Sequence, residues 1–178
     1  AGIIGQKGVL EITQNGRLEC ALFNQGVEGL FSDDLWLNDT NTWQHITLVY
    51  NNGLIQLYYN GIKQYEATSS AMTNLGSSSE RFNIGGKIKT GATSNFYNGW
   101  LDEVRVFDVA LTASQIQQMI HQEIEENSGF VRGTVIPKYV EDFTSSSKIS
   151  WEDLRLYYKF GTNFTDRKIT DYSESSLH

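Results

Sequence analysis

Three apolar runs separated by two Asn-Gly pairs make up the stretch WQHITLVYNNGLIQLYYNGIKQYEA, residues 43–67. An Asn-Gly pair accepts the positive φ angles of a type I′ turn, the tight turn that joins two antiparallel strands. The stretch therefore predicts a meander of three antiparallel strands. Side chains alternate between the two faces of a strand, so Ile46, Leu48 and Tyr50 are expected to share one face.

Further strand patterns lie on both sides of this meander. GVLEIT and RLECALF flank Gln14-Asn15-Gly16, which predicts a second hairpin. Strands are also expected in RFNIGGKI (81–88), whose glycines suggest a bend or bulge, and in GWLDEVRVF (99–107). Aromatic residues make up 12% of the chain and charged residues only 20%, a balance typical of an all-β protein. The predicted fold class is therefore all-β.

One segment instead predicts a short helix. LTASQIQQMIHQEI, residues 111–124, begins with Thr112, and Gln115 follows three residues later, which is the spacing of a capping box. Ile116, Met119 and Ile120 form a narrow apolar stripe. One such stripe cannot support an isolated helix, so this helix is expected to dock on the edge of a sheet.

The character of the chain changes after residue 124. The segment from 125 to 148 holds the only proline and is of mixed polarity, so it is interpreted as a connector. WEDLRLYYKF, residues 151–160, then alternates Leu154, Leu156, Tyr158 and Phe160 against more polar neighbours and Tyr157. This alternation predicts a half-buried strand with Tyr157 on its outer face.

Three stretches resemble the laminin-G-like, concanavalin A-like lectin/glucanase superfamily. They are NTWQHITLVYNNGLIQLYYNG (41–61), RFNIGGK (81–87) and YNGWLDEVRVFDVALTASQI (97–116). They occur in the order and spacing that the family shows. The resemblance implies a two-sheet antiparallel jelly-roll sandwich, with the short helix after the last strand of the module.

The opening strand of such a module is expected before these stretches, but its pattern appears near the other end, as LRLYYKFGTNFTDRKITDYSESSLH (154–178). The resemblance therefore implies a module over residues 1–124 that lacks its opening strands, a connector over 125–148, and an opening segment over 149–178. This last segment either begins a second module of a tandem array, the interpretation we favour, or fills the vacant strand position of the first module. Its apolar strand needs a sheet partner in both cases.

Asp102 and Glu103 are the two adjacent acidic residues that are candidates for a catalytic pair. The glucanases of this superfamily use a Glu-x-Asp-x-Glu pattern, which does not occur in this sequence. A retaining mechanism needs two carboxylates that converge on one face, about 5 Å apart. Adjacent residues of a strand point to opposite faces, so Asp102 and Glu103 are not expected to form that pair. The sequence therefore predicts a protein that is not an enzyme.

The same alternation gives these residues structural roles. Glu103 and Arg105 are two positions apart on one face and are expected to form an ion pair. Asp102 lies in line with two valines, which suggests partial burial, and a buried carboxylate needs backbone N–H partners or a cation. The resemblance offers Ca²⁺ as that cation, with Asp102 as a ligand and Asp171 as the counterpart of a further acid in relatives.

Aromatic side chains outside the expected core are candidates for ligand contact. Trp36, Phe96 and Tyr97 are proposed to bind a ligand, because aromatic rings stack on the apolar faces of sugars. Trp43 and His45 lie in the first expected strand of the meander, on the face opposite Ile46, and are expected to be structural, as are Glu103 and Arg105.

Net charge and the family resemblance bound the function. The net charge is −7 and the isoelectric point is near 4.9, so binding to nucleic acid phosphates is not expected. No apolar run reaches the length of a membrane span, so no membrane insertion is expected. The resemblance implies a non-catalytic module of a large secreted or cell-surface protein, an adhesin, that binds a glycan or an extracellular protein beside neighbouring modules. The alternatives are a structural spacer repeat and an ancillary module of a glycoside hydrolase.

Overall fold

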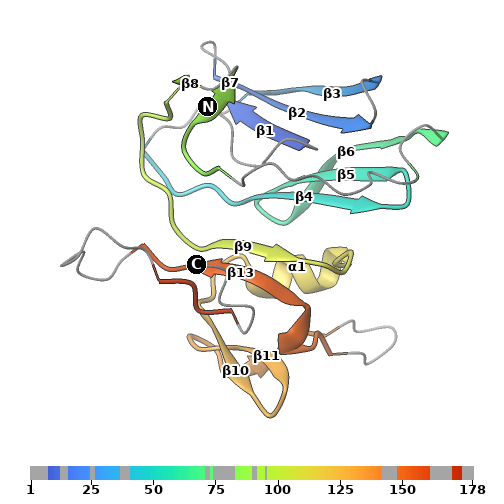
Figure 1. Ribbon diagram of the computed structural model, residues 1–178. Helices are drawn as coiled ribbons and strands as arrows, with labels where there is room; N and C mark the ends of the chain where they lie inside the picture. The colour runs from blue at the N-terminus through green and yellow to red at the C-terminus, as the bar shows by residue number, and fades with distance from the viewer. Residues whose placement is uncertain are drawn as a thin grey trace. The chain divides into compact units, whose positions relative to one another are not determined.

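A computed structural model describes residues 8–12, 16–24, 27–36, 41–70, 73, 83–89, 92–94, 96–141, 148–160 and 170–173 (Figure 1). The described residues include short antiparallel sheets, an α-helix and a 3₁₀ turn. The chain divides into two compact units. The first comprises residues 1–59 and 63–99, and the second comprises residues 60–62 and 100–178. The antiparallel sheets with one short helix confirm the predicted fold class and are consistent with a jelly-roll sandwich.

The predicted meander is confirmed. Its strands are β4 (Ile46–Asn51), β5 (Leu54–Tyr59) and β6 (Ile62–Thr68), hydrogen-bonded in that order. Asn52 and Gly53, at φ angles of 47° and 86°, make the left-handed turn between β4 and β5 that the Asn-Gly pair predicts. The register follows directly from this two-residue turn, with Asn51 opposite Leu54.

A second sheet of the first unit shares a core with the meander. It is formed by β1 (Gly8–Ile12), β2 (Arg17–Asn24) and β3 (Val27–Trp36), in that order. The pairing of β1 with β2 confirms the predicted hairpin. The buried residues of the shared core are Leu10, Leu18, Ile55 and Leu57, and Ile46, Leu48 and Tyr50 pack against them as expected from their common face.

The strand expected over residues 81–88 is shorter than predicted, and the bend expected at its glycines is confirmed. Residues 84–86 form bends, and Gly85 has a φ angle of 76°, in the left-handed region. The strand here is only β7 (Lys87–Lys89), which pairs with β8 (Ala92–Ser94). Residues 81 and 82 lie outside the described part of the chain.

The second unit begins with a strand and the predicted helix. β9 (Val104–Phe107) is followed by α1 (Ala113–Met119), which is shorter than the 14 residues expected. Both bonds of the capping box between Thr112 and Gln115 are present, so this prediction is confirmed. Ile116 and Met119 are buried, as the apolar stripe predicts.

The segment interpreted as a connector contains strands. β10 (Ile124–Asn127), β11 (Phe130–Gly133) and β12 (Lys138–Tyr139) form a sheet in that order. Ser128 and Gly129, at φ angles of 55° and 81°, make the tight turn between β10 and β11. Val131 and Val140 are fully buried, so residues 124–140 contribute to the core of the second unit.

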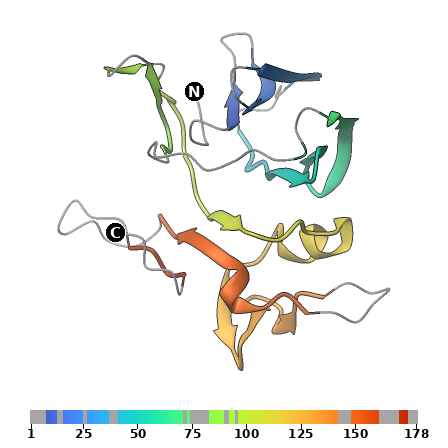
Figure 2. The ribbon, with the colours of Figure 1, turned by 45° about the vertical axis from the view of Figure 1, so that its right-hand side comes forward.

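The C-terminal strand, β13 (Leu154–Tyr158), follows the 3₁₀ turn η2 (Trp151–Asp153) and pairs antiparallel with β9 of the same chain. Figures 1 and 2 both show these two strands side by side. Residues 154–158, within the segment for which the sequence left two positions open, thus pair with a strand of this chain. The domain boundaries themselves stay a prediction.

The expected outward position of Tyr157 is wrong. Its side chain is completely buried, as is that of Leu154. The register of β13 against β9 shifts between Leu154 and Leu156, which is the sign of a β-bulge. The consecutive residues Leu156 and Tyr157 are both buried, so simple alternation does not separate a buried from an exposed face here.

Candidate functional site

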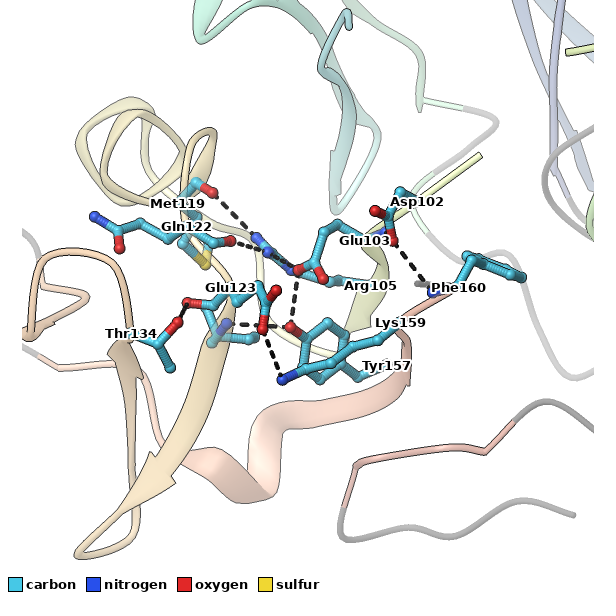
Figure 3. Close-up of polar contacts among 11 residues, drawn as sticks. Asp102, Glu103, Arg105, Met119, Gln122, Glu123, Thr134, Tyr157, Lys159 and Phe160 are labelled. Atoms are coloured by element: carbon cyan, nitrogen blue, oxygen red, sulfur yellow. Dashed lines mark hydrogen bonds and ion pairs between the residues drawn. The ribbon is translucent and has the colours of Figure 1, made fainter. Parts of the chain in front are cut away.

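The two adjacent acids lie just before β9 and have separate partners (Figure 3). The expectation that strand alternation separates them needs a correction, because the strand begins at Val104 and Glu103 has a φ angle of 53°. A left-handed residue breaks the two-residue repeat of a strand. The separation of the two side chains therefore rests on their contacts and not on strand alternation.

Asp102 is exposed, which corrects the expected partial burial. Its Oδ1 accepts a hydrogen bond from the backbone N–H of Glu103 at 2.8 Å. The same oxygen accepts one from the backbone N–H of Phe160 at 3.2 Å, so it links the start of β9 to the end of β13. The Asp102 carboxylate therefore connects two backbone segments by hydrogen bonds.

The predicted ion pair between Glu103 and Arg105 is confirmed. The Arg105 side chain is only 7% exposed, and the Glu103 side chain is 24% exposed. Arg105 also donates to the carbonyl oxygens of Met119, at 3.1 Å, and Gln122. These carbonyls lie at the end of α1, where backbone acceptors have no partner within the helix. Arg105 therefore joins β9 to the C-terminal end of α1.

Tyr157 completes this buried network. Its hydroxyl donates to Oε2 of Glu103 at 2.8 Å and accepts from the backbone N–H of Ile124 at 3.1 Å (Figure 3). Burial raises the pKa of Tyr157 above its ordinary value, so the phenol keeps its proton at neutral pH. We name Glu103, Arg105 and Tyr157 the corner network. In this network the Glu103 carboxylate is bound by Arg105 and Tyr157 and so has a structural role.

Asp171 is a second acid with unusual surroundings. It is 6% exposed, and its Oδ1 accepts from the backbone N–H groups of Tyr157, at 3.1 Å, and Ser173, at 2.9 Å. Its Oδ2 and the Oγ of Ser173 are buried and have no hydrogen-bond partner among the described residues. Buried oxygens in this state are costly unless a water molecule or a cation satisfies them.

The described part of the chain shows no cluster of metal-binding side chains. No group of three or more His, Cys, Asp or Glu residues is close enough to hold a metal ion there. Calcium takes six to eight oxygens, of which backbone carbonyls and water can supply several. Of the two acids considered, Asp171 is the one with an unsatisfied buried oxygen.

The predicted ligand-binding aromatics differ in accessibility. Phe96, in the first unit, is 73% exposed. Tyr97 is partly buried, and its ring lies so close to Gly99 that a Cβ there would come within 2.7 Å of it. Trp36 is the last residue of β3, and its side chain is outside the described part. Of the two candidates whose side chains are described, Phe96 has the ring that is more available to a ligand.

Two tryptophans depart from what the sequence suggested. Trp43, for which we expected a structural role, is 68% exposed. His45 is partly buried, and its Nδ1 lies 3.3 Å from the hydroxyl of Thr47. Trp100, in the second unit, is 86% exposed and was missed, because GWLDEVRVF reads as one continuous strand in which a tryptophan belongs to the core.

Comparisons with known proteins bear on these observations. A family model described as the concanavalin A-like lectin/glucanases superfamily matches residues 5–117. The crystal structure of an S-layer domain-containing protein from Clostridium thermocellum ATCC 27405, residues 221–444, is 26% identical, with a TM-score of 0.35. The match covers 63% of this chain and 55% of that one, so this chain spans about half its length. No curated protein matches the chain.

Proposed function

We propose, because this chain belongs to the concanavalin A-like lectin/glucanases superfamily, that it is a non-catalytic module that binds a glycan or an extracellular protein. The observation that carries the non-catalytic part is the use of both adjacent acids by the fold. Oδ1 of Asp102 accepts hydrogen bonds from two backbone N–H groups. Glu103 forms an ion pair with Arg105 and accepts a hydrogen bond from Tyr157. Two carboxylates held in this way do not face a common substrate.

We place this module in a large secreted or cell-surface protein, an adhesin, with neighbouring modules on the same chain. Support comes from the family, whose fold serves many such chains, so this part rests on analogy of fold. Among the described residues, no helix is both long and apolar enough to cross a membrane. The alternatives are a spacer repeat with no ligand and an ancillary module of a glycoside hydrolase.

Phe96 is the residue through which we propose to test binding. On an array of glycans and extracellular proteins, the wild-type chain is expected to retain at least one ligand. Phe96→Ala is expected to weaken that binding about tenfold, which corresponds to about 1.4 kcal/mol, the size of effect found for the few interface residues that dominate binding. Trp43→Ala is the matched control, since it removes another exposed aromatic ring of the first unit.

The array also separates the alternatives. A wild-type chain that binds nothing would favour the spacer. Hydrolysis of a bound glycan by the purified chain would contradict a non-catalytic module.

We also propose that Asp171 and Ser173 contribute oxygens to a calcium site, because Asp171 Oδ2 and Ser173 Oγ are buried without a partner among the described residues. Calcium at 100 times its dissociation constant is expected to stabilise the folded chain by about 2.7 kcal/mol, seen as a higher melting temperature. Asp171→Asn is expected to abolish this shift. Asparagine keeps the oxygen that accepts from Tyr157 and Ser173, so the fold should survive.

Magnesium is the control for ion type, and Asp102→Asn tests the acid first considered. A melting temperature that does not respond to calcium would contradict the site. Loss of the shift in both variants would add Asp102 to the ligands.

A further inference from the structure

A pocket of about 380 Å³ lies in the second unit, between α1 and the chain that follows β11. Its volume is within the range of sites for small molecules. Its wall is formed by Ser114, Gln117, Gln118, His121 and Gln122 from the helix region, with Ile136 and Lys138 opposite. The lining has no carboxylate, its one charged side chain is that of Lys138, and most of its other polar groups are neutral amides and a hydroxyl.

The amide of Gln122 is anchored at one end only. Its Oε1 accepts from the backbone N–H of Ile136 at 2.9 Å. Gly133 leaves room for this contact, because a Cβ there would come within 2.7 Å of the same oxygen. The Nε2 of Gln122 has no partner among the described residues. The hydrogen bond to Oε1 therefore fixes the orientation of the Gln122 amide, and its Nε2 remains available to donate to a ligand.

Gln117 shows the complementary arrangement. Its Nε2 donates to the carbonyl oxygen of Gly61 at 3.2 Å, which leaves Oε1 as an available acceptor. Ser114 Oγ accepts from Gln118, so the Ser114 O–H can still donate. His121 is exposed and adds an imidazole. The pocket thus offers donors and acceptors that are held in place before any ligand arrives, which lowers the entropic cost of binding.

Gln118 provides an internal contrast. Its Nε2 donates to the carbonyl oxygen of Glu141, and its Oε1 accepts from the backbone N–H of the same residue at 3.2 Å. Both ends of this amide serve the fold. Gln118 is therefore expected to take no part in ligand binding.

We infer that this pocket is a subsite for one neutral sugar ring, a hexose or an N-acetylhexosamine. A sugar hydroxyl both donates and accepts, which matches the mixed set left on Ser114, Gln117 and Gln122. The side chain of Ile136, in a residue that is 62% exposed, supplies an apolar wall for the C–H face of the ring. This inference rests on the proposed glycan binding and adds a contact in the second unit, separate from the one tested at Phe96 in the first unit.

Nuclear magnetic resonance of the whole chain tests the subsite. The probes are methyl glucoside, methyl galactoside, methyl mannoside and N-acetylglucosamine, each added at millimolar concentration. At least one of them is expected to shift the side-chain amide signals of Gln117 and Gln122 and to leave that of Gln118 in place. Gln122→Glu is expected to weaken this binding at least tenfold, because glutamate keeps the oxygen bound by Ile136 and removes the Nε2 donor.

The outcomes separate the subsite from the proposed function. Gln122→Glu must melt within a degree of the wild type for its loss of binding to count as support. A wild-type chain that binds glycans on the array, while Gln122→Glu binds equally well and the amide signals do not move, would overturn the subsite alone. A wild-type chain that binds no glycan on the array and no sugar in solution would overturn glycan binding itself.

Discussion

Arg105→Ala is expected to lower the free energy of unfolding of the second unit by about 3–5 kcal/mol, as is typical when one partner of a buried ion pair is removed. The guanidinium is 7% exposed and contacts Glu103, the carbonyl oxygen of Met119 and that of Gln122. Its loss leaves the part-buried Glu103 carboxylate without its opposite charge and removes the side-chain donor to both carbonyls, whereas the Tyr157 hydroxyl still donates to Glu103 and the Gln122 N–H still donates to Met119. Urea denaturation followed by circular dichroism measures the change.

Arg155→Ala is the matched control for this prediction. Arg155 pairs with Asp108, but the two side chains are 52% and 38% exposed. Ion pairs of this kind contribute about 0–1 kcal/mol. Arg105→Lys separates the contribution of the charge from that of the side-chain geometry. Lysine keeps the charge, but it lacks the planar guanidinium that contacts three acceptors at once. Equal, small effects of Arg105→Ala and Arg155→Ala would show that the corner network does not stabilise the fold.

Local signals in the sequence were the reliable ones. The turn at Asn52-Gly53 and the capping box of Thr112 and Gln115 depend on neighbouring residues alone, so their patterns predicted them correctly. The ion pair of Glu103 with Arg105 was also expected from sequence, although for a partly incorrect reason. Strand alternation put the two side chains on one face, whereas Glu103 has a left-handed backbone.

Tertiary contacts decided the features that the sequence did not predict. A positive φ at a non-glycine residue such as Glu103 costs free energy and persists only where contacts hold it, and those contacts come from distant residues. The strands β10 and β11 are four residues each, too short for a clear two-residue pattern. Their Ser128-Gly129 turn is nevertheless a recognisable turn signal.

The candidate site could be predicted only in part from the sequence. The exposure of Phe96 could be proposed from its position outside the strand patterns, and the structure agrees with it. Trp100 could not be separated from its strand. The proposed sugar subsite depends on which end of each glutamine amide the backbone occupies, and only the three-dimensional structure shows this.

Tyr157→Ala is expected to cost about 3–5 kcal/mol of the free energy of unfolding, the range for a buried aromatic side chain replaced by alanine. The ring is completely buried, so its removal leaves a cavity between β13 and its neighbours. Its hydroxyl also links β13 to Glu103 and to the backbone of Ile124. Hydrogen exchange of the Ile124 amide should accelerate together with the loss of stability.

Two conservative variants divide this effect into its parts. Tyr157→Phe keeps the ring and removes only the hydroxyl, which leaves the buried N–H of Ile124 without an acceptor and should cost about 1–3 kcal/mol. Tyr158→Phe removes the hydroxyl of the adjacent residue, for which the structure shows no hydrogen-bond partner among the described residues, and should change little. The larger share of the Tyr157→Ala loss then belongs to packing. If Tyr157→Phe and Tyr158→Phe behave alike, the hydroxyl does not hold β13 to the corner network, and the strand is retained by apolar burial and backbone pairing with β9 alone.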